Sequence, residues 1–249
     1  SGGILGGKSV AQEGAMTRTT QPVQQTRTQN PFINQSGKNP EDMTDQELAE
    51  EIRRREEIRF DEAAAELRQA LQESPDLQEL QKHLQIDQTP EGLRIQIVDR
   101  EGEPMFPLGS ARMFDKTERL LTLVTEVIQG LPNQITIKGH TDAIPYSGDG
   151  DYTNWELSAD RANASRRVLI DNGIPQDRIF TVVGKAATEP LIKEDPRDPR
   201  NRRISIILLR DSIVKQALRN AGLAPDQRQE DSTEMMENPR PTPGKRQFP

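Results

Sequence analysis

The sequence predicts an α+β fold: a sandwich of two core helices packed on one face of a mixed four-stranded sheet, with an extra N-terminal helix. Two observations support this prediction. Short apolar runs typical of strands alternate with two longer stretches whose apolar residues recur at helical spacing. Their order is strand, helix, strand, helix, strand, strand, which favours helices layered on a single sheet.

The N-terminal helix is expected between two clear signals. Thr44-x-x-Glu47 has the pattern of a capping box, and Pro75 cannot continue a helix. The intervening run is mostly Glu and Arg, and its apolar stripe is thin, consisting of Leu48, Ile52, Phe60, Leu67 and Leu71. We therefore expect a surface or partner-seeking helix. A second short helix is predicted at residues 76–86, where leucines recur at helical spacing.

The core elements follow in order. The predicted strands span residues 92–99, 135–138, 179–184 and 203–209. The predicted core helices span residues 114–130 and 153–173, and a last short helix spans residues 211–222. The second core helix opens with another capping-box pattern, Thr153-x-x-Glu156, and both core helices end at a glycine.

The composition predicts that only part of the chain folds. Only 32% of the 249 residues are hydrophobic and 29% are charged, too few apolar residues for one core that uses the whole chain. We expect a flexible linker at residues 1–40, a helical linker or spacer at 41–88, the folded domain at 89–222 and a disordered tail at 223–249.

The composition also excludes several functions. A formal net charge of −7 argues against nucleic acid as a partner, because phosphate binding needs a concentrated basic face. The absence of cysteine removes disulfides and cysteine metal sites. No apolar run approaches the ~18 residues of a membrane span, and no signal peptide is visible. Any targeting segment is therefore expected outside this chain.

The predicted helix after Thr153 carries an arginine where an apolar residue is expected. Arg161 falls on the same helical stripe as Leu157 and Ala164. A guanidinium among core-facing residues is costly unless its donors meet an anion. One reading is a structural arginine paired with a nearby carboxylate. The other is an arginine at a pocket edge that binds a ligand carboxylate in bidentate geometry.

Asp142 follows directly on a predicted strand, where sheets of this kind often bind ligands. It can equally serve the turn, because Asp forms local hydrogen bonds with the backbone. If Asp142 and Arg161 faced one pocket, they would suit a zwitterion, with Asp142 binding the ammonium and Arg161 the carboxylate.

His140 and Ser158 invite a catalytic interpretation that the pattern does not favour. The only other histidine is His83, so His140-x-Asp142 offers too few ligands for a typical zinc site, and we expect no metal and no cofactor. No strained nucleophile elbow or oxyanion loop accompanies Ser158. We therefore expect no enzymatic activity.

Several motifs in register resemble a known family. They are Gly139-His140-Thr141-Asp142, Asn154-x-x-Leu157-Ser158-x-x-Arg161-Ala162, Val183-Gly184 and Asn201-Arg202-Arg203. Their order and spacing over roughly residues 90–210 resemble the OmpA-like peptidoglycan-binding domain. The resemblance implies an OmpA-like sandwich and non-covalent binding of cell-wall peptidoglycan.

The resemblance also implies which residues bind the ligand. In this family an Asp and an Arg hold the diaminopimelate of the peptide stem, and the matching residues are Asp142 and Arg161. Thr141 and Asn154 match polar positions in the same pocket. Leu157, Phe106 and Arg202 are weaker matches. Strand parity places Arg202 with Ile204 and Ile206, so that it can instead stabilise the sheet edge, and Asn201 is expected to brace its loop.

Within the family, three segments are most similar to the MotB group of flagellar stator proteins: residues 106–111, 143–145 and 195–203. This resemblance implies a periplasmic location, anchoring in the inner membrane by an N-terminal helix missing from this chain, a membrane-embedded partner of the MotA type and a homodimer. The alternatives are a general envelope-tethering protein of the OmpA or lipoprotein type and a cell-wall hydrolase.

Overall fold

The fold was analysed in a computed structural model that describes residues 43–146 and 150–223. The chain divides into two units, Ser1–Leu48 and Ala49–Pro249. In the first unit only the start of a helix is described. The predicted linker at residues 1–40 and nearly all of the predicted tail lie outside the described residues, so the predicted segment boundaries stay predictions.

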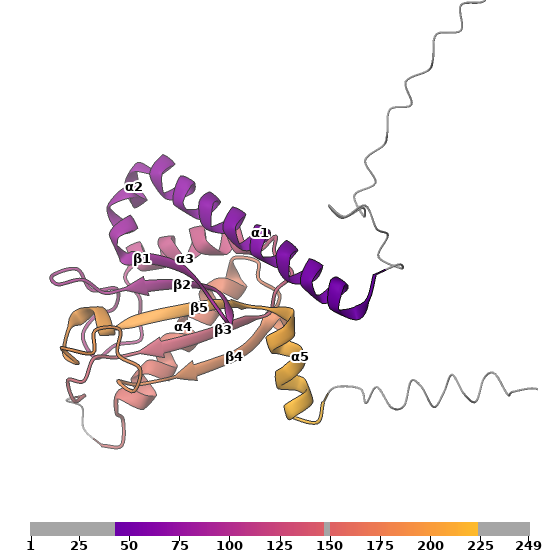
Figure 1. The fold of residues 1–249 in the computed structure, drawn as a ribbon. Coiled ribbons are helices and arrows are strands. Elements are labelled where there is room, and N and C mark those ends of the chain that lie inside the picture. The colour runs from indigo at the N-terminus through magenta and orange to yellow at the C-terminus, as the bar shows by residue number, and fades with distance from the viewer. Residues whose placement is uncertain (1–42, 147–149, 224–249) are drawn as a thin grey trace, which may run out of the picture. The chain divides into compact units, whose positions relative to one another are not determined.

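The sheet has five strands in the order β1-β2-β5-β3-β4 (Figure 1). The strands are β1 (Leu84–Thr89), β2 (Gly92–Val98), β3 (Ile135–His140), β4 (Ile179–Gly184) and β5 (Arg203–Leu209). Neighbouring strands are antiparallel except β3 and β4, which are parallel. The mixed sheet predicted from the sequence is therefore confirmed, with one strand more than expected.

The helices are α1 (Asp45–Glu73), α2 (Pro75–Gln78), α3 (Asp115–Ile128), α4 (Asn154–Asp171) and α5 (Asp211–Asn220). Short 3-10 turns lie at Glu79–His83, Gln176–Arg178 and Pro199–Asn201. Both predicted capping boxes form, because Thr44 and Thr153 each exchange hydrogen bonds with the glutamate three residues later. None of the helices in the described part of the chain is both long and apolar enough to cross a membrane.

One face of the sheet carries the hydrophobic core. Alternate residues of β2, β5 and β3 point to this face, and the strand register places Ile95 and Ile137 on either side of Ile206. Helices α3 and α4 cover these residues with Leu120, Val124, Leu169 and their neighbours. The two predicted core helices thus occupy the predicted layer.

Helix α1 is the main correction to the predicted fold. We expected a surface or partner-seeking helix, but its C-terminal half is buried in the same core cluster, through Phe60, Ala63, Ala64, Leu67 and Leu71. Only the N-terminal end of the stripe, Leu48 and Ile52, stays partly exposed. The thin stripe did not reveal this burial. A helix that covers one side of a core buries only one face, and its other faces can carry charged residues.

The additional strand β1 is the second correction. We predicted helix over residues 76–86, whereas helical structure ends at His83 and the chain pairs with β2 from Leu84 onward. Leu84 and Ile86 alternate with polar residues, and such a short run fits either period. Pairing with β2 supplies the backbone hydrogen bonds that decide in favour of a strand.

Three strand ends meet at one edge of the sheet. Strands β2 and β3 end there and β5 begins there, because β5 is antiparallel to both. Helix α4 lies very close to this edge: a Cβ added at Gly139 would collide with the Ser158 carbonyl, and one at Gly184 would lie 2.7 Å from the Ala159 nitrogen. The two glycines therefore allow close helix–sheet packing and bring α4 against the strand ends.

Candidate functional site

Asp142 lies just beyond the end of β3 and is buried. Its Oδ1 accepts a hydrogen bond from the Ile144 backbone N–H at 3.1 Å, so the predicted turn contact exists. Its Oδ2 accepts a hydrogen bond from Arg202 Nη1 at 2.7 Å. Each oxygen of a carboxylate can accept more than one hydrogen bond, so Asp142 keeps acceptor capacity for a ligand.

Arg161 projects from α4 and is only 4% exposed. Its Nε donates to the Ser110 carbonyl at 2.9 Å and its Nη2 donates to the Pro107 carbonyl at 3.3 Å. Its guanidinium also lies 4.8 Å from the centre of the Phe106 ring. The structural alternative predicted a carboxylate partner, but Arg161 is held by backbone carbonyls and an aromatic ring.

Arg202 bridges two buried carboxylates at the same sheet edge. Its Nε donates to Asp99 Oδ2 at 2.8 Å, and its Nη1 contacts Asp142. Asp99 directly follows β2 and Arg202 directly precedes β5. The alternative role predicted for Arg202, stabilising the sheet edge, therefore fits its contacts, and the same contacts place it beside Asp142.

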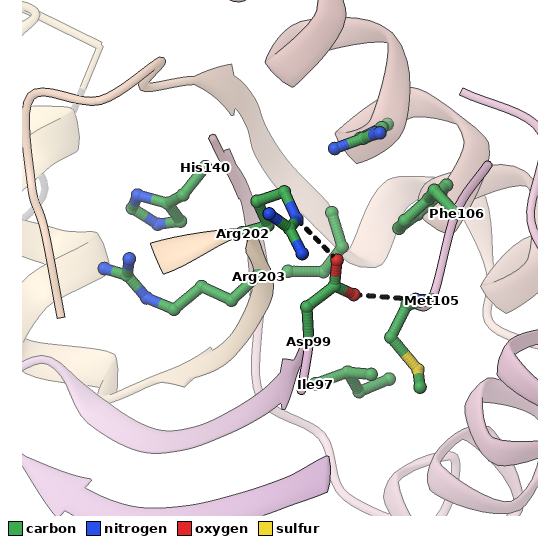
Figure 2. Close-up of a pocket in the computed structure, with 9 residues that line it drawn as sticks. Ile97, Asp99, Met105, Phe106, His140, Arg202 and Arg203 are labelled. Carbon is green, nitrogen blue, oxygen red and sulfur yellow. Dashed lines mark hydrogen bonds and ion pairs between the residues drawn. The ribbon is translucent and has the colours of Figure 1, made fainter. Parts of the chain in front are cut away.

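A pocket of about 350 Å³ opens beside these residues. Six of the seven predicted binding residues line it: Thr141, Asp142, Asn154, Leu157, Arg161 and Arg202. The seventh, Phe106, lies under Arg161 and lines a small adjoining cavity of about 10 Å³ instead (Figure 2). The structure thus brings together residues from three separate stretches of the sequence.

The lining of the pocket keeps polar atoms without protein partners. Arg161 uses two of the five N–H donors of its guanidinium on the carbonyls of Pro107 and Ser110. The hydroxyl of Thr141 is buried and has no hydrogen-bond partner among the described residues. A carboxylate, a guanidinium and a hydroxyl can together bind a ligand that carries an ammonium next to a carboxylate.

Burial acts on the pKa values of three charged groups at this end of the sheet: Arg161, Asp99 and Arg202. It lowers the pKa of Arg161, an effect opposed by the charge of Asp99. It raises the pKa of Asp99, against the hydrogen bonds from Arg202 and Met105. Burial also acts to lower the pKa of Arg202, but the hydrogen bonds to its two carboxylate partners raise it overall. The arginines remain cationic at neutral pH.

His140 and Ser158 have positions that fit a structural role. His140 is the last residue of β3, and burial lowers its pKa to about 3, so its imidazole is neutral at pH 7. Ser158 donates to the Trp155 carbonyl at 2.9 Å and accepts from the Ala186 N–H at 3.0 Å, which ties α4 to the chain after β4. No group of three metal-binding side chains is found in residues 43–146 and 150–223.

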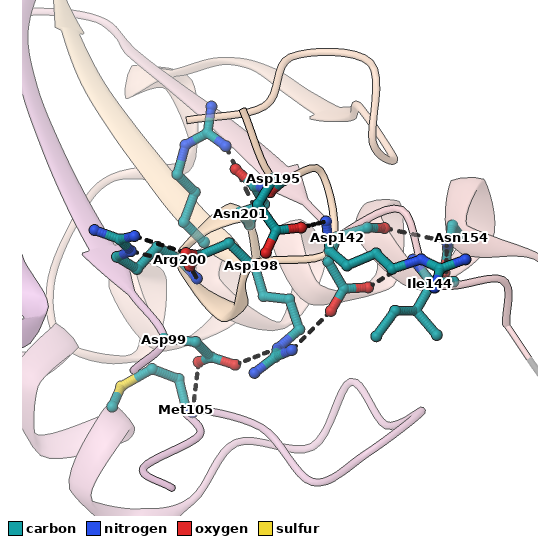
Figure 3. Close-up of polar contacts among 12 residues, drawn as sticks. Asp99, Met105, Asp142, Ile144, Asn154, Asp195, Asp198, Arg200 and Asn201 are labelled. Atoms are coloured by element: carbon teal, nitrogen blue, oxygen red, sulfur yellow. Dashed lines mark hydrogen bonds and ion pairs between the residues drawn. The ribbon is translucent and has the colours of Figure 1, made fainter. Parts of the chain in front are cut away.

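Two asparagine side chains, Asn201 and Asn154, fix neighbouring backbone segments by hydrogen bonds. Asn201 donates to the Asp195 carbonyl at 2.9 Å (Figure 3). It also donates to the Ile192 carbonyl and accepts from the Ile192 N–H, which confirms that it braces its loop. Asn154 donates to the Ile144 carbonyl at 2.8 Å and fixes the segment after Asp142 in the same way. Both amides therefore act through backbone groups of neighbouring loops.

Sequence reasoning missed part of the lining. Leu108, Gly109, Ile144, Pro145 and Tyr146 complete the wall. The Tyr146 hydroxyl donates to the Gly109 carbonyl at 3.3 Å and so links the two loops that carry these residues. Asp99 was also missed as a partner of Arg202. A carboxylate at the end of a predicted strand was the only available signal, and it does not identify the partner.

Part of the chain is similar in sequence to known proteins. Residues 105–203 match the OmpA family. The chain is 46% identical over 162 residues to motility protein B of Escherichia coli strain K12, covering 64% of this chain and 53% of that protein. It is 29% identical over 133 residues to motility protein B of Bacillus subtilis strain 168, covering 52% of this chain and 50% of that protein. The chain thus spans about half the length of these relatives.

A solved structure shares the fold. The crystal structure described as that of a MotB-like protein from Desulfovibrio vulgaris aligns with a TM-score of 0.54 at 21% identity, covering 66% of this chain and 96% of that chain. At this identity the likeness shows the fold alone. The sequence match means that residues 105–203 form a domain of the OmpA family.

Proposed function

We propose that this domain binds peptidoglycan non-covalently, by holding the free ammonium and carboxylate of diaminopimelate in the peptide stem. Asp142 receives the ammonium, and Arg161 receives the carboxylate through N–H donors that its backbone partners leave free. The hydroxyl of Thr141 supplies a third polar contact. No bond is made or broken, so the domain is a binding module.

The observation that carries this proposal is the convergence of six predicted residues on one pocket. Among the residues that the structure describes, the charged lining consists of one carboxylate and two guanidinium groups: Asp142, Arg161 and Arg202. Arg202 is also paired with a second carboxylate, Asp99, so the charges of the four groups balance. A zwitterionic ligand enters such a site without leaving a buried charge unpaired.

We further propose that this binding anchors a flagellar motor stator to the cell wall. The E. coli and B. subtilis relatives are both named motility protein B, which supports a role in motility. In this role the domain lies in the periplasm, its full-length protein is held in the inner membrane by an N-terminal helix, and its membrane-embedded partner is of the MotA type.

A stator needs paired anchors, so we propose that the chain works as a homodimer. The predicted contact was the apolar stripe of α1, and its C-terminal part is used in the core of the chain itself. Leu48 and Ile52 remain available for a second copy. Light scattering at high concentration is expected to give the mass of a dimer, and a monomer at every concentration would contradict this arrangement.

The binding proposal is tested by calorimetric titration with a soluble stem peptide that ends in meso-diaminopimelate. Asp142→Asn and Arg161→Gln are each expected to weaken binding by at least about tenfold, the effect of losing one charge-assisted contact. Asp171→Asn and Arg167→Gln are matched controls, since both change exposed residues of α4. Circular dichroism checks that all four variants fold. Unchanged affinity in both pocket variants would refute the assignment.

A further inference from the structure

The structure points to a buried carboxylate outside the pocket, Asp99, as the residue that positions both halves of the proposed clamp. Asp99 is 3% exposed and does not line the 350 Å³ pocket. This inference rests on the proposed function, in which Asp142 and Arg161 hold the two ends of a zwitterion. We infer that Asp99 sets the place and charge of Asp142 through Arg202, and the place of Arg161 through the segment after Met105.

The first connection runs through Arg202. Asp99 Oδ2 accepts a hydrogen bond from Arg202 Nε at 2.8 Å, and the Asp99 N–H donates to the Arg202 carbonyl at 3.0 Å. Arg202 then reaches Asp142 with its Nη1 at 2.7 Å. Figure 2 shows Asp99 and Arg202 side by side at the wall of the small cavity. Because its Nε is bound to Asp99, Arg202 presents only the Nη end of its guanidinium to Asp142.

The second connection runs through the backbone. The other oxygen of Asp99, Oδ1, accepts a hydrogen bond from the Met105 N–H at 2.7 Å, as Figure 3 also shows. Met105 begins the segment that places the Phe106 ring under the Arg161 guanidinium and aims the carbonyls of Pro107 and Ser110 at it. The two oxygens of one carboxylate thus act on opposite ends of the clamp.

The charge of Asp99 also affects how well Asp142 attracts the ammonium of a ligand. Arg202 shares its positive charge between two carboxylates, so Asp142 remains able to attract an ammonium. If Asp99 is neutral, Arg202 has Asp142 as its only ionic partner and competes with the ligand for it. The pocket then carries an excess positive charge and favours an anion over a zwitterion.

Loss of the Asp99 charge is therefore expected to change the ligand preference of the pocket, which a purely structural role of Asp99 would not produce. Two soluble probes are compared: meso-diaminopimelate and pimelate, which has the same carboxylates and no ammonium. Asp99→Asn keeps the shape of the side chain and an oxygen for Met105, but it loses the charge. It is expected to weaken binding of diaminopimelate about tenfold and to leave pimelate binding unchanged or stronger, so that the ratio of the two affinities falls about tenfold or more.

Asp99→Ala separates the two connections. It removes the contact with Met105 as well, so both probes are expected to bind more weakly. Nitrogen-15 NMR of the arginine Nε–H groups, recorded without ligand, follows the positions directly. In Asp99→Asn the Arg202 signal is expected to shift and exchange faster with water while the Arg161 signal is retained; in Asp99→Ala both are expected to change. If the alanine variant does not fold, the asparagine variant alone tests the role of Asp99.

Asp87→Asn is the matched control. Asp87 also pairs with an arginine across the sheet, Arg94 at 2.6 Å, but this pair lies on the surface. The control is expected to bind both probes like the unmodified chain. An unchanged affinity ratio in Asp99→Asn, or an unchanged Arg202 signal, would overturn the role of Asp99. If the unmodified chain bound neither diaminopimelate nor the stem peptide, the proposed function would fail, and the NMR signals would still decide whether Asp99 positions the two arginines.

Discussion

At the scale of single residues, Arg161 is a buried cation whose guanidinium donates to the backbone carbonyls of Ser110 and Pro107. Its place on a core-facing helical stripe predicted that its donors meet an anion, but within the chain they meet backbone carbonyls. These carbonyls were not predictable, because every residue carries one and the sequence does not show which of them faces Arg161. The placing of Asp142 and Arg161 on one pocket was implied by the family resemblance, whereas the double pairing of Arg202 was not.

His140 makes the stability of the fold depend on pH. Burial lowers the pKa of its imidazole to about 3, with a smaller contribution from Arg203, against an ordinary value of 6.5. Between these values the unfolded chain binds a proton that the folded chain does not. The contribution of neutral His140 is therefore complete above pH 6.5 and is lost as the pH falls toward 3.

This dependence is tested by urea unfolding across that pH range. The free energy of unfolding is expected to fall with decreasing pH, by on the order of 2–4 kcal/mol from His140. In His140→Gln this part of the decrease should be missing, which leaves only the slope from other titrating groups. Identical slopes in the two proteins would mean that His140 is not held neutral.

At the scale of elements, the core helices and strands were predicted well, but strand β1 and the packing of α1 were not. Helices α3 and α4 and strands β2 and β5 fall within a few residues of their predicted bounds, since burial on one face imposes a clear period. Strand β1 was missed because its short run fits two periods. The packing of α1 was missed because a pattern shows which face is apolar and not what covers it.

The assignment of α1 to the core predicts a large stability effect. Leu67 is 0% exposed, and Leu67→Ala is expected to lower the free energy of unfolding by about 2–5 kcal/mol through the cavity it leaves. Ile58 lies on the same helix and is 44% exposed, so Ile58→Ala is expected to cost less than about 1 kcal/mol. Denaturant unfolding measures both. If both substitutions lowered the free energy of unfolding by the same small amount, α1 would not belong to the core and would act as a spacer.

The close contact between α4 and the strand ends predicts a second effect. A methyl group at Gly139 would meet the Ser158 carbonyl, so Gly139→Ala forces α4 away from β3 and moves Arg161 with it. We expect a loss of at least about 2 kcal/mol in unfolding free energy together with weaker ligand binding. Gly130→Ala is the control, because nothing lies within 4 Å of the added methyl. A stable Gly139→Ala variant with normal binding would contradict this packing.

At the scale of the whole molecule, the site exists because the sheet gathers distant segments at one edge. Asp99 and Arg202 are 103 residues apart, and Asp142 and Arg202 are 60 residues apart. The fold class was predictable from local periodicity, but these pairings depend on strand order, which periodicity does not encode. Six of the seven predicted binding residues nevertheless line one pocket, because the motifs that carry the family resemblance lie at the end of β3 and at the start of α4 and β5.

The central claim is that the pocket between Asp142 and Arg161 attaches this chain to peptidoglycan. Sedimentation with purified diaminopimelate-containing sacculi tests it most directly, using the unmodified chain, Arg161→Gln and the surface control Arg167→Gln. The unmodified chain and the control are expected to sediment with the sacculi, and free meso-diaminopimelate is expected to release them. Arg161→Gln is expected to remain in the supernatant while its circular dichroism spectrum is retained. Sedimentation of folded Arg161→Gln with the sacculi, to the same extent as the unmodified chain, would contradict the account.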